Sequence, residues 1–178
     1  MINFTANYID RTQVKKLYDV QNSNMDVAFV EFNSANKNDL RTLESLSYSW
    51  GPSELPHFIY ICADEQAKGA SSLAFDRFFA ITRLQDSYEK INPQNVLGIA
   101  QTSHACGAVE IQFLQTHPEY EYANPNRQIK KVGNALVKSI QKFFKNFDID
   151  VIPKNSAETF YEKLGFVKNT PRKFRLFA

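Results

Sequence analysis

The sequence predicts an α/β fold, with a mixed sheet flanked by helices, from three observations. Two strand-like runs, 95–102 and 108–114, are close enough together to form a hairpin. A long amphipathic pattern follows at 129–144, and a short apolar run at 147–152 comes after it. The 178 residues, 43% of them apolar, suffice for one core. We therefore expect a single domain over 1–178, in which 1–24 form an N-terminal elaboration.

The N-terminal half gives weaker patterns. Modest helical spacing occurs at 10–20 and 38–47, and the run 27–32 between them has the composition of a strand. The runs 57–62 and 73–84 are rich in apolar and aromatic residues, so we expect strands there, although the second run also fits a helix.

The second strand of the predicted hairpin carries alternating polar and apolar side chains. Val109, Ile111 and Phe113 alternate with polar or small neighbours. Because successive side chains of a strand point to opposite faces, Glu110 and Gln112 should share the face opposite the apolar set.

The amphipathic helix at 129–144 should pack one face on the sheet. Its apolar residues recur every three or four positions, at Ile129, Val132, Leu136, Ile140, Phe143 and Phe144. Followed by the run 147–152, it predicts a right-handed crossover between two parallel strands.

Another helix should begin near Asn155, which can serve as its N-cap with Glu158 as capping-box partner. Gly165 supplies the left-handed stop that ends it. Residues 173–177 alternate between basic and apolar side chains and suit a final strand.

Charge is distributed unevenly along the chain. Residues 1–123 carry 9 Lys+Arg and 15 Asp+Glu, whereas residues 124–178 carry 12 and 4. This asymmetry indicates that the C-terminal part meets a polyanion, either nucleic acid or a phosphorylated cofactor, unless it is only a solvated face. The two cysteines, Cys62 and Cys106, have no metal-ligand or disulfide spacing, so no metal site is expected. The chain shows no transmembrane run or secretion signal, and we expect a cytoplasmic protein.

The predicted strand–helix junction offers unpaired backbone N–H groups and a positive dipole end to an anion. Here Arg127-Gln128-Ile129-Lys130-Lys131-Val132-Gly133-Asn134 resembles the acetyl-CoA signature of the GNAT N-acetyltransferase superfamily, Q/R-x-x-G-x-G/A. Gln128 takes the first position and Gly133 the second glycine. Lys131 stands where the first glycine is usual, which departs from the family pattern.

A second segment strengthens the resemblance. Residues 155–166, NSAETFYEKLGF, look like the family's other signature, N-x-x-A-x-x-F-Y-x-K-x-G-F. The resemblance covers 95–178, which we take as the acetyl-CoA-binding core. It implies a mostly antiparallel GNAT-like sheet whose strands splay apart after Leu114, where the pantetheine arm lies. The cofactor-binding residues that it implies are Leu114, Gln115, Thr116, Gln128, Ile129, Lys130, Lys131, Val132, Gly133, Asn134, Asn155 and Tyr161.

The resemblance also implies two catalytic residues. Tyr161 matches the tyrosine that protonates the departing CoA sulfur, a role that suits a phenol protonated at neutral pH; without the motif it reads as a core aromatic. Glu110 lies where some relatives carry a glutamate base, although charged side chains are common on exposed strand faces. Asn155 matches a position that often binds the pantetheine, and it can also cap its helix.

The leading hypothesis is an N-acetyltransferase that moves the acetyl group of acetyl-CoA to a primary amine of a small molecule, peptide or protein. A non-catalytic acyl-CoA-binding regulatory module is the alternative. Nucleic-acid binding ranks last, because the basic segments lack interleaved exposed aromatics. No membrane partner is expected, and a homodimer is among the assemblies that the sequence allows.

Overall fold

The computed structural model describes residues 7–16, 23–51, 54–105, 107–121 and 123–178. In this part of the chain one nine-stranded sheet runs in the order β6-β1-β2-β3-β4-β5-β7-β9-β8. The strands are β1 (Asn7–Lys16), β2 (Asn24–Phe32), β3 (Asp76–Arg83), β4 (Val96–Ala105), β5 (Ala108–Thr116), β6 (Ile129–Lys130), β7 (Asp148–Val151), β8 (Val167–Lys168) and β9 (Phe174–Leu176). The helices are α1 (Lys37–Ser49), α2 (Leu55–Ala67), α3 (Val132–Phe143) and α4 (Glu158–Glu162), with short 3₁₀ turns at η1 (Ser71–Leu73), η2 (Pro93–Asn95), η3 (Pro118–Tyr120) and η4 (Asn155–Ala157).

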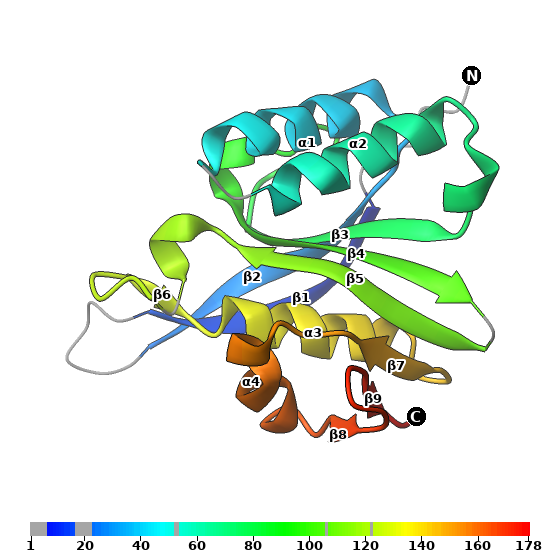
Figure 1. The fold of residues 1–178 in the computed structure, drawn as a ribbon. Helices are drawn as coiled ribbons and strands as arrows, with labels where there is room; N and C mark the ends of the chain where they lie inside the picture. Colours follow the sequence, from blue (N-terminus) through cyan, green and yellow to red (C-terminus); the bar gives the residue numbers. More distant parts are fainter. Residues whose placement is uncertain (1–6, 17–22, 52–53, 106, 122) are drawn as a thin grey trace.

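The helices form two layers, one on each face of the sheet. Figure 1 shows α1 and α2 above the central strands, and α3 and α4 below them. Each helical layer packs against its face of the sheet and forms a separate hydrophobic core there. Leu46, Trp50 and Ile59 are buried against one face, and Leu136, Ile140 and Tyr161 lie in the core on the other face.

The C-terminal half follows the sequence prediction closely. The expected hairpin is β4–β5, which pairs antiparallel from Gly98–Thr116 to Ala105–Ala108. From β5 the chain passes through α3 to β7, which pairs with β5 in parallel as predicted. The final strand is β9, antiparallel to β7. The overall result is the mixed, mostly antiparallel sheet that the sequence predicted.

Two N-terminal predictions are wrong. Residues 10–16 belong to strand β1 instead of a helix, and 17–20 lie outside the described residues. The β-branched Ile9, Thr12 and Val14 favour a strand there. The expected strand at 57–62 lies inside α2, which has Pro56 in its first turn and buries Ile59 and Ala63 on one side. A run of that length carries too little periodicity to separate a helix from a strand.

Two boundaries near the predicted cofactor site also differ. Helix α3 begins at Val132, because Ile129 and Lys130 form the short strand β6 beside Lys16 and Lys15 of β1. Asn155 opens a 3₁₀ turn instead of capping a helix, and neither η4 nor α4 has a side-chain cap. Glu158, its expected capping partner, forms an ion pair with Lys168 at 3.6 Å. The stop at Gly165 is confirmed, with a φ of +94° that side-chain-bearing residues rarely adopt.

Candidate functional site

The N-terminal turn of α3 has backbone and charge features that favour an anion. The first backbone bond of the helix runs from the Ala135 N–H to the Lys131 carbonyl at 2.9 Å. The N–H groups of Val132, Gly133 and Asn134 precede this bond and have no carbonyl one turn earlier in the helix. They coincide with the positive end of the helix dipole. The exposed side chain of Lys131 adds charge at the same place.

Gly133 lies in a closely packed contact. A Cβ at this position would lie 3.3 Å from Phe160 Cζ and 3.7 Å from Thr116 Cγ2. The first turn of α3 is thus pressed against both α4 and the end of β5. This contact explains a glycine that costs about 1 kcal/mol relative to alanine inside a helix. The structure therefore brings together Thr116, Gly133 and the motif segment that contains Phe160.

Beside this turn, strands β5 and β7 part. Their pairing runs from Ala108–Asp148 to Ile111–Val151, while β5 continues to Thr116 alongside β4 alone. A bulge lies next to Gln112, where Gln101 pairs with Phe113 and Thr102 with Ile111. Bulges bend a strand and increase its twist. The separation therefore starts after Ile111, before the position at Leu114 that the sequence suggested.

Tyr161 lies in α4 and is 6% exposed. Its ring packs edge-on against Phe160 and Phe166, with ring centroids 4.9 and 5.4 Å away. Burial raises the pKa of Tyr161 to about 12. The phenol therefore keeps its proton at neutral pH, as a hydrogen-bond donor must.

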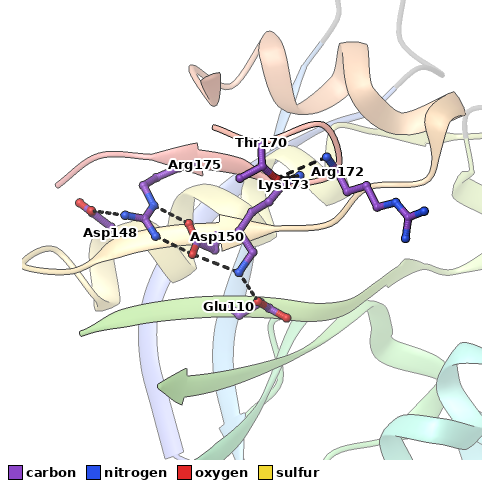
Figure 2. Close-up of polar contacts among 7 residues, drawn as sticks. All are labelled: Glu110, Asp148, Asp150, Thr170, Arg172, Lys173 and Arg175. Atoms are coloured by element: carbon purple, nitrogen blue, oxygen red, sulfur yellow. Dashed lines mark hydrogen bonds and ion pairs between the residues drawn. The ribbon is translucent and has the colours of Figure 1, made fainter. Parts of the chain in front are cut away.

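Glu110 belongs to a network of charged side chains shown in Figure 2. Lys173 Nζ donates to Glu110 Oε2 at 2.9 Å and to Asp150 Oδ2 at 3.4 Å. Arg175 holds the buried Asp150 through two bonds of 2.7 and 2.9 Å, and it also reaches Asp148 at 3.3 Å. The hydrogen bond from Arg175 lowers the pKa of Asp150. The hydrogen bond to Glu110 raises the pKa of Lys173.

Sequence reasoning missed Asp150, Lys173 and Arg175 as parts of the site. A signal for them exists. Asp148 and Asp150 alternate with apolar residues, so both lie on one face of β7. Lys173, just before β9, and Arg175 within it show the same alternation. What the sequence lacks is the register, which sets Asp150 opposite both Glu110 and Arg175.

The remaining predicted residues are more scattered. Ile129 is buried and Lys130 half-buried in β6, while Gln128 is exposed just before it. At the end of β5, Leu114 packs against the core under α3, and Gln115 bonds to Glu121. Asn155 is exposed. Of the described residues, no three His, Cys, Asp or Glu side chains are grouped to hold a metal ion.

The aromatic side chains of α1, α2 and the turn between these helices include both buried and exposed residues. Trp50 is a core residue, 2% exposed, with its ring edge-on to His117 at 5.2 Å. Tyr48 and His57 are exposed. On α2, Phe58 stacks on Phe113 of β5 at 6.0 Å, an aromatic pair that sequence reasoning did not single out. Cys106 lies outside the described residues.

Comparisons with known proteins agree with this fold. Residues 62–175 match the family described as acetyltransferase (GNAT) domain. A GNAT-family structure from Desulfovibrio desulfuricans superposes with a TM-score of 0.56 at 15% identity, covering 85% of this chain and 98% of that one. AtaT, solved with acetyl-methionyl-tRNA, gives 0.56 at 14% identity over 85% and 94%. The PaiA N-acetyltransferase of Thermoplasma acidophilum, solved with coenzyme A, gives 0.51 at 16% identity over 85% and 97%.

A search among curated proteins found no similar sequence. No helix in the described ranges has the length and hydrophobicity to cross a membrane. The family match covers most of the chain and includes both sequence signatures. The chain therefore belongs to the GNAT acetyltransferases, which are acetyl-CoA-dependent N-acetyltransferases.

Proposed function

We propose that this enzyme transfers the acetyl group of acetyl-CoA directly to a primary amine. The observation that carries the proposal is the meeting of three elements: the first turn of α3, the end of β5 and α4. They meet at Thr116, on the part of β5 that extends beyond its pairing with β7. An anion-binding helix end next to an opened sheet suits a long phosphorylated thioester, with its phosphates at the helix and its acyl end among the strands.

In this proposal the N–H groups of Val132, Gly133 and Asn134 bind the pyrophosphate, and Lys131 adds a cation beside it. The part of β5 from Leu114 to Thr116 offers its backbone to the pantetheine. Gln128, Ile129, Lys130 and Asn155 remain predicted cofactor residues. Of these, Ile129 would act through packing, because it is buried in β6.

Acetyl transfer needs a neutral amine, a positioned thioester and a proton for the departing thiolate. Glu110 would accept a proton from the acceptor ammonium, directly or through water. The amine nitrogen then bonds to the carbonyl carbon while the carbon–sulfur bond breaks. Tyr161 would donate its phenolic hydrogen to the sulfur, a role for which its protonated state is suited. The nitrogen loses its second proton as the amide forms, and that proton would return through water to the Tyr161 phenolate.

The chemical class of the amine acceptor is to be found with a panel of candidate amines. AtaT, which shares this fold, was solved with acetyl-methionyl-tRNA. We therefore include methionyl-tRNA with spermidine, tyramine, methionine amide and a lysine peptide in the panel of acceptors to test. Release of free thiol from acetyl-CoA, dependent on one of these amines, supports the proposal. Acetyl-CoA binding without turnover of any amine would favour a non-catalytic acyl-CoA-binding module.

The cofactor placement is tested by Gly133→Asp. A carboxylate here would clash with Phe160 and repel the phosphates, so CoA affinity should fall by more than about tenfold, or roughly 1.4 kcal/mol. Gln141→Asp is the matched control, because it adds the same charge on an exposed part of α3 two turns away. Circular dichroism checks that both variants are folded, and calorimetry measures CoA binding.

If Gly133→Asp does not fold, Lys131→Ala serves instead. It removes a cation from the proposed phosphate site without adding a clash, so CoA should bind more weakly and with less salt dependence. Unchanged CoA affinity in a folded Gly133→Asp protein contradicts the placement.

A further inference from the structure

The network around Glu110 joins three strands on one face of the sheet. Glu110 on β5 pairs in register with Asp150 on β7, and Asp150 pairs with Arg175 on β9. Lys173 precedes β9 and extends back across β7 to Glu110, as Figure 2 shows. This row is next to the last pair, Ile111–Val151, before the two strands part. The network therefore borders the opening in which we place the thioester.

The contacts assign different partners to the two cations. Arg175 makes two bonds with the buried Asp150, an arrangement that fixes the planes of both groups. Lys173 is then left with a longer contact to Asp150, 3.4 Å, and a shorter one to Glu110, 2.9 Å. Asp150 therefore anchors the Lys173 ammonium, and the ammonium in turn holds one oxygen of Glu110. The Glu110 side chain is 35% exposed, so without this bond it would be free to adopt several rotamers.

We propose that Lys173 is a positioning residue for Glu110 in the acetyl transfer. It holds Oε2 of the carboxylate and leaves Oε1 to accept a proton from the acceptor. Asp150 and Arg175 support Lys173 from behind. The proposal rests on the proposed function, in which Glu110 is the base. It extends that function by naming the side chain that orients the base, which lies sixty-three residues further along the chain.

The alternative is that Lys173 only ties the C-terminal strands to the sheet. The two roles differ in a double-mutant cycle, because a positioning residue acts through Glu110 and a structural tie does not. The variants are Lys173→Met, Lys173→Arg and Glu110→Gln, plus the double Lys173→Met/Glu110→Gln. Lys168→Met is the matched control, since Lys168 lies in the same C-terminal segment but pairs with Glu158 of α4.

Steady-state kinetics use the amine of the panel that turns over fastest, and calorimetry measures CoA binding. Lys173→Met should lower kcat by about tenfold, because a misplaced catalytic group loses part of its effect, while the Kd for CoA stays unchanged. Lys173→Arg should restore most of kcat, since a guanidinium can also bond Glu110. In the Glu110→Gln protein, Lys173→Met should have no further effect. Lys168→Met should behave as the wild type.

Each other outcome is decisive. If Glu110→Gln loses activity but Lys173→Met keeps wild-type kcat, the positioning role is wrong and the proposed function stands. If the effects of the two changes multiply in the double variant, Lys173 acts independently of Glu110 and the proposal fails. If Glu110→Gln retains wild-type kcat, Glu110 is not the base, and the proposal that Lys173 positions a base is also wrong. If no amine of the panel releases thiol, the proposed function itself is refuted.

Discussion

Replacing Lys131 by glycine should stabilise the protein. Among the residues that the structure describes, Lys131 is the one non-glycine residue with a positive φ, at φ 66° and ψ 20°. Its side chain is exposed and makes no capping hydrogen bond. It stands where the family signature usually has glycine. At the start of α3 the left-handed backbone is therefore adopted by a residue that carries a Cβ.

The expected gain is the difference between two effects. A left-handed conformation costs a residue with a Cβ about 1–2 kcal/mol. Glycine avoids that cost but loses about 0.5–1 kcal/mol more conformational freedom on folding. Lys131→Gly should therefore stabilise by about 0.5–1 kcal/mol. For a domain of this size, about 2–4 °C of Tm corresponds to each kcal/mol, so Tm should rise by about 1–4 °C.

Thermal unfolding without CoA is the assay, with two companion variants. Lys131→Ala removes the long charged side chain but keeps the Cβ, so it should give little gain. Lys131→Asn should fall between alanine and glycine, because asparagine tolerates the left-handed region. If Lys131→Gly is no more stable than Lys131→Ala, backbone strain at this position is not what limits stability.

Three further predictions follow from the same contacts. Tyr161→Phe should lower kcat by about 10²- to 10⁴-fold in steady-state assays, while calorimetry shows unchanged CoA affinity. Because the pKa of Tyr161 is raised to about 12, deprotonation of this phenol should not lower wild-type activity up to about pH 10. Gly98→Ala should destabilise by about 1–3 kcal/mol in urea unfolding, because its Cβ would lie 2.8 Å from Val132 Cγ1, and Val132→Ala should recover part of the loss. Asp150→Asn should cost about 3 kcal/mol at neutral pH. Because Arg175 holds the pKa of Asp150 below 3.8, that stabilisation is present above this value and lost as pH falls through the lower folded pKa, so unfolding of the variant should depend less on pH in acid.

The C-terminal half was predictable because its patterns are long or punctuated. Helix α3 shows its apolar face over three turns, and Gly165 ends the next helix in the left-handed conformation expected of it. The N-terminal errors came from segments whose local pattern is weak. The run at 57–62 is apolar on nearly every side, so its period is hidden, and only tertiary packing shows that Ile59 and Ala63 face the core.

The candidate site divides in the same way. The signatures named Gly133 and Tyr161 as candidates, and in the structure Gly133 packs closely against Phe160. The charged network could not be predicted from the sequence, because it depends on the register in which β7 pairs with β5 after the crossover. Moving β7 by one residue would turn Asp150 to the opposite face and separate it from Glu110. The early parting of β5 and β7 likewise depends on a bulge, which no local pattern announced.

The parallel pairing of β5 with β7 also dictates the order in which the molecule can be completed. The pairs β1–β2, β3–β4 and β4–β5 are joined by short connections, whereas β3 reaches β2 only after α1 and α2, and β7 reaches β5 only after the whole of α3. Contacts between segments so far apart in the chain form slowly. Until β7 docks, the outer edge of β5 is open to pairing with another chain, a known route to aggregation. Residues up to Lys173 must therefore have emerged from the ribosome before Glu110 can acquire its cation partner, and the nascent chain should be most prone to aggregate in the interval before that.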